Sequence, residues 1–430
     1  MLLLKCSLEA KTPFMIGNGY SENCDRDILI DSKGFPYIPG TSLCGLCRHF
    51  LREQDWEGVE DIFGSISMQK GKDDKESKII FYDAFLEKAD GSRGYAVSVR
   101  DSVRLQNKLA VEMSKFDYEI VEAGARFTFR VEVLLDKMEE GLAKEKKLIA
   151  LLLKGFSEGD IRIGAKTTRG FGIFEAKDIK VCSLDLHNKE EMKKHICREY
   201  KWEEWQEKNI SYKSLYETIE TDLELDSFLF IRDYAATEKV DKGDNESKFV
   251  DARTLLNQRG NPVIPGTAWA GVFRHHAAKI LKESKYQDRE EREIESLLND
   301  LFGYESAPNC PPDKELRSKS QILFSETELE EYEMMNRTRT AVDRFGASAL
   351  QTGALFTGRI ACKKDISGEK KLLTLTVKIK KGRDEKLARN LVELCIEDLK
   401  RGVLAVGGNT SVGAGIFKAY EIGGTNEGKA

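Results

Sequence analysis

The chain carries the same two motifs twice, and this internal duplication limits how it can fold more than any other feature. Residues 38–49, IPGTSLCGLCRH, return at 264–275 as IPGTAWAGVFRH, an offset of 226 residues (264 − 38). Residues 164–174 return at 407–417, an offset of 243 residues (407 − 164). Two motifs that recur in the same order are typical of a duplicated domain.

The duplication predicts two domains, at residues 1–180 and 222–425, joined by a linker at 181–221. This linker segment is rich in Lys and Glu and contains Trp202 and Trp205, so we expect a helical linker with an aromatic face that docks on one domain. With 430 residues, of which 40% are hydrophobic, the chain has enough apolar material for two cores.

Each copy is predicted to be an α+β domain in the order β-α-β-β-α-β, which is the order of a ferredoxin-like (RRM-like) fold. The strands are expected, in pairs from the two copies, at 2–10 and 223–232, at 79–85 and 322–325, and at 124–128 and 353–357. A Pro-Gly-Thr helix start follows the first strand, with Thr41 or Ser42, and Thr267, as N-caps. The fold by itself says nothing about function.

The Gly-rich loops of the two copies are candidate phosphate sites. Glycines let the backbone approach a ligand closely with its N–H groups facing a phosphate, and Lys166 and Arg169 add two positive charges. The loops lack the Gly-Lys-[Ser/Thr] ending of a Walker loop, which argues against nucleotide hydrolysis. The alternative is a Gly-rich hairpin without a ligand. The candidate residues are Lys166, Arg169, Gly170, Gly172, Asn409 and Gly413.

The Pro-Gly-Thr helix starts are a second pair of candidate phosphate sites. A helix N-terminus carries a partial positive charge and unpaired N–H groups, and an arginine follows in each copy roughly two turns later. Simple helix capping is the alternative. The candidate residues are Gly40, Thr41, Ser42, Arg48, Gly266, Thr267 and Arg274.

One aspartate keeps the same distance from the repeated motif in both copies. Asp25 lies 13 residues before Ile38 (38 − 25), and Asp251 lies 13 residues before Ile264 (264 − 251). A carboxylate beside bound RNA can hold Mg²⁺ or orient a 2′-hydroxyl for in-line attack on the next phosphate. Asp25 and Asp251 are therefore the candidate catalytic and metal-binding residues. A turn aspartate without a catalytic role is the alternative.

Composition limits the classes of protein to which the chain can belong. A formal net charge of −5 argues against a free-standing, nonspecific nucleic-acid binder and favours a restricted RNA surface with protein partners. No apolar run approaches the ~18 residues of a membrane helix, and the first residues lack the pattern of a signal peptide. We therefore expect a cytoplasmic protein without membrane contact, whose nine cysteines are free thiols.

Taken together, these motifs resemble the RAMP superfamily of CRISPR-associated proteins, and within it the backbone subunits of type III complexes. The resemblance lies in Gly-x-Pro-x-Ile-Pro-Gly-Thr-Ser-Leu-x-Gly-x-x-Arg at 34–48, Phe-Gly at 63–64 and 302–303, Ile-Ile-x-x-Asp-Ala-Phe at 79–85, and the Gly-rich loops. Residues 342–347, VDRFGA, are similar to the family's Val-x-Ile-Asp-Arg-x-Thr-Gly signature. The likeness covers both copies and leaves out the linker and the tail.

The resemblance implies a crRNA-binding palm with a protruding thumb in each copy, at 100–122 and 336–352, and it places Arg339 on the RNA. It implies that the loop aspartates, Asp25 and Asp251, cut target RNA with Mg²⁺ or another divalent metal. The implied partners are crRNA, target RNA, neighbouring backbone subunits and the large signature subunit of the complex. Two fused backbone domains resemble the multi-domain subunits of type III-D systems.

Departures from the family pattern leave other functions open. The family's usual Lys after Ser-Leu is Cys44 in the first copy and Ala270 in the second, and Arg169 is replaced by Val412, so we expect weaker RNA binding by the second copy. One alternative is a crRNA-processing RAMP endonuclease, which uses a histidine of the first domain, although no histidine precedes His49. The other is a scaffold that binds crRNA without cutting.

Overall fold

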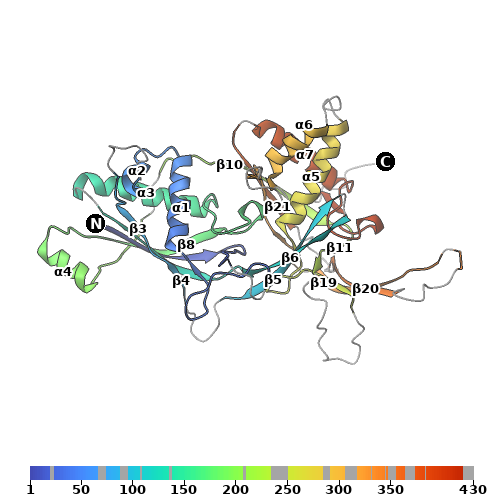
Figure 1. The fold of residues 1–430 in the computed structure, drawn as a ribbon, viewed down its shortest axis with the longest axis horizontal. Coiled ribbons are helices and arrows are strands. Elements are labelled where there is room, and N and C mark those ends of the chain that lie inside the picture. Colours follow the sequence, from blue (N-terminus) through green and yellow to red (C-terminus); the bar gives the residue numbers. More distant parts are fainter. Residues whose placement is uncertain are drawn as a thin grey trace, which may run out of the picture. The chain divides into compact units, whose positions relative to one another are not determined.

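Figure 1 shows the computed structural model of the chain, whose described part is a mixed α/β protein. The structure describes residues 1–19, 24–65, 74–87, 95–106, 109–134, 138–206, 210–233, 250–283, 291–305, 317–330, 332–343, 345–346, 355–363, 373–382 and 384–419. Contacts divide the chain into two compact units. Unit 1 consists of Met1–Val99, Phe116–Thr167 and Phe171–Leu215, and unit 2 of Arg100–Lys115, Thr168–Gly170 and the chain from Tyr216 onward. No helix in this described part is both long and apolar enough to cross a membrane.

Unit 1 is built around an antiparallel sheet whose central strand is β1 (Leu2–Ala10), which confirms the first predicted strand. β1 pairs with β7 (Arg126–Val133) on one side and with β8 (Phe174–Ser183) on the other. Alternate residues of β1, from Leu2 to Ala10, enter the main core, and Leu3 on the opposite face joins a smaller apolar cluster with Met1 and Leu184. Helices α1 (Gly40–Glu53) and α3 (Met138–Ser157) contribute to the same core and lie along one side of the sheet (Figure 1).

Short strands and helices complete unit 1. β3 (Ile79–Phe81) and β4 (Ala84–Leu86) pair with β7, β2 (Tyr37–Ile38) pairs with β4, and β9 (Glu203–Glu204) pairs with β8. The short helices are α2 (Val59–Phe63) and α4 (Lys189–Cys197).

Most of the segment expected as a linker, up to Leu215, belongs to unit 1, whereas residues 216–221 already form the start of a strand of unit 2. Its described residues contain one helix, α4, and are otherwise mostly extended. Trp202 packs against the cluster that includes Met1 and Leu3, and Trp205 packs against the main core of unit 1. The aromatic side chains of this segment therefore belong to unit 1, while the boundaries at 180 and 221 stay a prediction.

Unit 2 has the same strand order in a sheet of its own. Its central strand β10 (Tyr216–Leu225) pairs with β21 (Leu373–Lys380) and β22 (Phe417–Ala419), and β17 (Ile322–Phe324) pairs with β21. The order β17-β21-β10-β22 matches the order β3-β7-β1-β8 that the pairings of unit 1 give. Its core includes side chains of α5 (Gly266–Glu283), α6 (Glu291–Phe302) and α7 (Glu385–Lys400).

A long hairpin precedes the third main strand of each repeat. In the first repeat β5 (Val97–Gln106) pairs with β6 (Leu109–Val121), and in the second β19 (Tyr332–Thr340) pairs with β20 (Leu355–Lys363). β20 also pairs with β11 (Phe228–Leu229) and, in parallel, with β13 (Ala252–Thr254), which pairs with β12 (Arg232–Asp233). The remaining short pairs are β14 (Val263–Ile264) with β18 (Thr327–Glu328), and β15 (Tyr304–Glu305) with β16 (Arg317–Ser318).

Two of the expected strands are placed differently by the structure. The first strand of unit 2 runs from Tyr216 to Leu225 rather than over 223–232, because Ile219 and Thr221 already turn inward between charged neighbours. The two Gly-Ala-x-Phe-Thr sequences are not equivalent: residues 124–128 lead into β7, whereas 353–357 lead into β20 of the hairpin. Residues 353 and 354 themselves lie outside the described part.

The Gly-rich loops provide a matched test of the fold. Gly415 has φ +70°, and a Cβ there would lie 1.8 Å from the carbonyl oxygen of Val406, whereas Gly413 has φ +86° with open space around it. We expect Gly413→Ala to lower the free energy of unfolding by about 1–2 kcal/mol through backbone strain alone. Gly415→Ala adds a backbone clash and should cost more than about 4 kcal/mol. Urea unfolding compares the two variants, and equal losses would contradict the close approach.

Candidate functional site

Four glycines of the two loops, Gly164, Gly172, Gly407 and Gly415, are required by contacts of the chain with itself. A Cβ at Gly164 would lie 2.3 Å from the carbonyl oxygen of Met15, and one at Gly172 would lie 2.1 Å from that of Ile163. Gly407 and Gly415 make the corresponding approaches in unit 2, to Phe230 and Val406. The glycines therefore need no ligand to explain them, and phosphate binding by the loops stays a prediction.

Lys166 lies over an aromatic pair in unit 1. Its Nζ is 4.7 Å from the ring centroid of Phe116 and 3.3 Å from that of Tyr118, both on β6, and the guanidinium of Arg26 lies 6.0 Å from the Phe116 ring. Lys166 has φ +57°, and Asn409, its counterpart in the second loop, has φ +59°. The left-handed backbone is thus common to both loops, while the cation and its aromatic support belong to the first.

Four other predicted residues, Arg169, Gly170, Gly266 and Arg274, lie close together inside unit 2. A Cβ at Gly266 would lie 2.3 Å from the carbonyl oxygen of Arg169, and one at Gly170 would lie 2.5 Å from the amide nitrogen of Glu326. Desolvation lowers the pKa of Arg274, and the charge of Arg169 lowers it further. The start of α5 is therefore closely packed by backbone.

The start of α1 is capped by a carboxylate from within unit 1. The N–H of Gly40 donates to Asp83 Oδ1 at 2.7 Å. Pro39 is the N-cap and makes no side-chain cap, so the prediction of Thr41 or Ser42 as N-cap is wrong; both lie in the first turn. Thr267 is likewise the second residue of α5. A phosphate at the start of α1 would have to compete with Asp83.

The two motif arginines join neighbouring helices. Arg48 donates to Glu60 and, at 2.9 Å, to the carbonyl oxygen of Gly64, which follows α2. Arg274 donates to the carbonyl oxygens of Leu298 and Gly303 at 3.1 and 3.2 Å and to Asn299 Oδ1 at 2.5 Å, all at the end of α6. These contacts give both arginines a structural role, and RNA binding by them stays a prediction.

The contacts of Arg274 predict a loss of stability that RNA binding would not produce. Arg274→Ala leaves two partly buried carbonyl groups without their charged donor, and we expect a cost of about 2–3 kcal/mol in the free energy of unfolding. Arg292→Ala, at an exposed position on α6, should cost less than about 0.5 kcal/mol. Urea unfolding without RNA measures both, and equal stabilities would remove the structural role.

The two loop aspartates are anchored in the same way. In unit 1, Asp25 Oδ2 accepts from the N–H of Asp117 at 3.0 Å, and the N–H of Asp25 donates to Asp117 Oδ1 at 2.8 Å. In unit 2, Asp251 Oδ2 accepts from the N–H of Thr357 at 2.6 Å, and the N–H of Asp251 donates to the carbonyl oxygen of Thr357 at 2.9 Å. Each exposed aspartate is therefore fixed on the return strand, β6 or β20, of its own hairpin.

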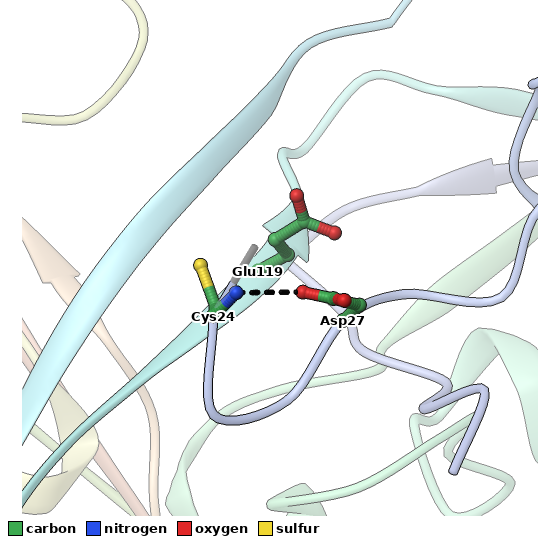
Figure 2. A group of neighbouring side chains, drawn as sticks. All are labelled: Cys24, Asp27 and Glu119. Atoms are coloured by element: carbon green, nitrogen blue, oxygen red, sulfur yellow. Dashed lines mark hydrogen bonds between the residues drawn. The ribbon is translucent and has the colours of Figure 1, made fainter. Parts of the chain in front are cut away.

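Figure 2 shows three side chains that converge at the turn containing Asp25, namely Cys24, Asp27 and Glu119. An oxygen of Asp27, an oxygen of Glu119 and the sulfur of Cys24 lie within 4.8 Å of one another. Asp27 is buried and accepts from the N–H of Cys24 at 2.9 Å, while Glu119 projects from β6 toward this turn. Together with Asp117, four carboxylates gather at this loop; we call Asp25, Asp27, Asp117 and Glu119 the acidic site.

The acidic site fits a divalent cation held by oxygen atoms. Mg²⁺ and Mn²⁺ prefer carboxylate ligands. Desolvation raises the pKa of the Cys24 thiol to about 11, and the surrounding carboxylates contribute to the rise, so the thiol is protonated at neutral pH. Asp27 and Glu119 are the residues whose oxygens are close enough to share one ion.

The corresponding positions of unit 2 carry different chemistry. With Asp25 and Asp251 aligned, Asp27 corresponds to Arg253 (offset 251 − 25 = 226). With Asp117 and Thr357 aligned, Glu119 corresponds to Arg359 (offset 357 − 117 = 240). No group of three metal-ligating side chains lies near Asp251 among the residues that the structure describes.

Sequence reasoning identified the loop aspartates but not the strand residues that complete the site. Asp117 and Glu119 lie more than 90 positions from Asp25 in the sequence, so only the pairing of the loop with β6 brings them together. Their alternation with Phe116 and Tyr118 was the available signal, because it gives β6 one acidic and one aromatic face. Arg339 lies on β19 of the second hairpin, opposite Phe356.

Comparison with known proteins identifies the family. The sequence model of the RAMP superfamily matches residues 7–175 and 222–418. The chain is also 26% identical over 208 residues to the CRISPR system Cms endoribonuclease Csm3 of Methanocaldococcus jannaschii, in an alignment that covers 42% of this chain and 80% of that protein. Because the two matched regions contain both copies of the repeated motifs and most of the sequence, the chain belongs to the RAMP superfamily.

Proposed function

We propose that the chain is a crRNA-binding backbone subunit of a type III CRISPR RNA-guided interference complex. Its membership of the RAMP superfamily supports this, as does its similarity to an endoribonuclease named as part of a CRISPR system. In this proposal its partners are crRNA, target RNA, neighbouring backbone subunits and the large signature subunit. The complex is cytoplasmic, and the fused pair of domains is of the type III-D kind.

Each repeat is, in this proposal, a ferredoxin-like palm with a thumb. In both sheets the strands lie in the order second, third, first, fourth along the repeat, which supports this fold. The hairpins β5–β6 and β19–β20 overlap the predicted thumb positions, 100–122 and 336–352, and supply the thumbs. The repeats are taken as 1–180 and 222–425 with the linker at 181–221, and the second opens with β10.

The acidic site is proposed to cut target RNA, and its four converging carboxylates are the observation that carries this. Asp27 and Glu119 would hold a divalent cation, which supplies charge stabilisation for the reacting phosphate and lowers the pKa of a bound water. Asp25 is exposed beside them and fixed by the N–H of Asp117, so its free oxygen is presented to solvent where a phosphate can approach. In this arrangement the buried Asp27 and the half-buried Glu119 would bind the ion, and the exposed Asp25 would face the RNA.

Asp251 was predicted from the sequence as a second cutting site, and it keeps the anchoring contact of Asp25. Its neighbours Arg253 and Arg359 replace two carboxylates of the acidic site. We therefore propose metal-dependent cutting by the first repeat alone.

Cleavage of labelled target RNA by the assembled complex in Mg²⁺ tests this function. Asp25→Asn and Glu119→Gln should each slow the appearance of one product at least about 100-fold, because both remove charge from the acidic site and keep its shape. Asp251→Asn is the matched control, and it should leave that product unchanged. Retention of crRNA should be the same in all three variants.

Other outcomes separate the competing functions. Unchanged cutting by Asp25→Asn and Glu119→Gln together would remove the acidic site from the reaction. Metal-independent cutting of precursor crRNA would favour the processing endonuclease. If the wild-type complex retains crRNA but does not form the cleavage product assigned to this chain, the chain is a scaffold that binds crRNA without cutting.

A further inference from the structure

We infer that the site around Asp251 binds an RNA phosphate directly through Arg253 and Arg359, without a divalent cation, whereas the acidic site requires one. The inference rests on the proposed function for the nature of the ligand, an RNA strand. It adds that the two repeats, which share one strand order and one anchoring contact, present different charges to the phosphate backbone.

The two arginines occupy neighbouring positions on adjacent strands. β13 and β20 run parallel, and Arg253 lies directly opposite Arg359 in their register. Paired residues of a sheet project from the same face, so the two side chains lie on one side of the sheet. Both are exposed. Two exposed guanidinium groups side by side repel each other unless an anion lies between them.

The same face carries hydrogen-bonding groups suited to a phosphate. Thr338 on β19 is exposed, and its Oγ1 is 2.9 Å from Oγ1 of the buried Thr357, which lies two residues before Arg359 on β20. Asn336 lies opposite Arg359 in the β19–β20 register. Arginines, hydroxyl groups and a side-chain amide are the groups that commonly bind nucleic-acid phosphates.

Asp233 holds one of the arginines in place. Arg253 donates from Nε to Asp233 Oδ2 at 3.1 Å, and the Asp233 side chain is only 11% exposed while that of Arg253 is 46% exposed. Nε is one of five donors of a guanidinium, so this contact fixes the side chain and leaves its outer edge in solvent. Arg253 therefore presents an oriented charge at the surface rather than a mobile one.

The charges around the two aspartates explain why only one site needs a cation. The acidic site has four carboxylates, and the nearby cations Arg26 and Lys166 lie over the aromatic face of β6 instead. A phosphate approaching four carboxylates is repelled unless a divalent cation intervenes. Among the described residues beside Asp251, Arg253 and Arg359 offset the charges of Asp251 and Asp233, so a phosphate meets two guanidinium groups without net repulsion, and a divalent cation finds no group of three metal-ligating side chains.

The test is RNA binding by the full-length chain with and without chelator. A fluorescent single-stranded RNA is titrated in Mg²⁺ and in EDTA against wild type and Arg253→Gln/Arg359→Gln. The double variant should bind about tenfold more weakly, and by the same factor in both buffers. Arg292→Gln/Arg401→Gln, which removes two exposed arginines elsewhere in unit 2, is the charge-matched control and should lose less than about threefold.

The same titration applied to the acidic site gives the opposite pattern. Wild type should bind more weakly in EDTA than in Mg²⁺, and Asp27→Asn/Glu119→Gln should abolish that difference. A double arginine variant that binds like its control, or whose loss appears only in Mg²⁺, overturns the inference. If wild type binds no RNA in either buffer, the proposed function fails, and the inference fails with it.

Binding of Mn²⁺ alone provides a second readout. Titration followed by electron paramagnetic resonance should find a site that Asp27→Asn/Glu119→Gln removes and Asp251→Asn does not. Arg253→Asp/Arg359→Glu, which installs the acids of the first repeat, should create a further Mn²⁺ site. A Mn²⁺ site in the wild-type chain that disappears with Asp251→Asn contradicts the inference.

Discussion

The contact between each loop aspartate and the return strand of its hairpin is the interaction on which the site depends. It occurs once in each unit, between Asp25 and Asp117 and between Asp251 and Thr357. In both, the strand N–H donates to the aspartate carboxylate and the aspartate N–H donates back to the strand residue. In each unit it fixes a polar loop on a strand that follows much later in the sequence. Because the contact sets the register between loop and strand, it also decides which side chains surround the aspartate.

The same scaffold therefore supports two chemistries. The repeated strand order and the repeated glycine approaches place the loop, the hairpin and the Gly-rich turn alike in each unit. Within that frame, exchange of Asp27 and Glu119 for Arg253 and Arg359 replaces two negative charges by two positive ones while the strand order stays the same. The two arginines are exposed, Glu119 is half-buried, and Asp27 is buried and accepts from the N–H of Cys24.

The duplication and β1 could be predicted from the sequence, because apolar alternation and repeated motifs are local signals. The sequence predicts the start of β10 seven residues too far along the chain, at 223 instead of 216. Its inward-facing residues include the polar Thr221 and several outward-facing ones are charged, and such a pattern is also typical of a linker. The sequence alone predicts that the motif arginines bind RNA, because a cationic side chain does not reveal its partners within the fold. Those partners include the carbonyl oxygens of Gly64 and Gly303, which follow the neighbouring helices. The partners of Asp25 depend on long-range pairing, which no local pattern encodes.

Whether the chain holds a guide RNA can be read from the nucleic acid that it retains. The chain is expressed with its neighbouring complex subunits and a CRISPR array, purified, and its bound nucleic acid is extracted and sequenced. We expect ribonuclease-sensitive RNA of discrete length whose sequence derives from the array. A chain that emerges without nucleic acid, or with RNA of random length and origin, would contradict it.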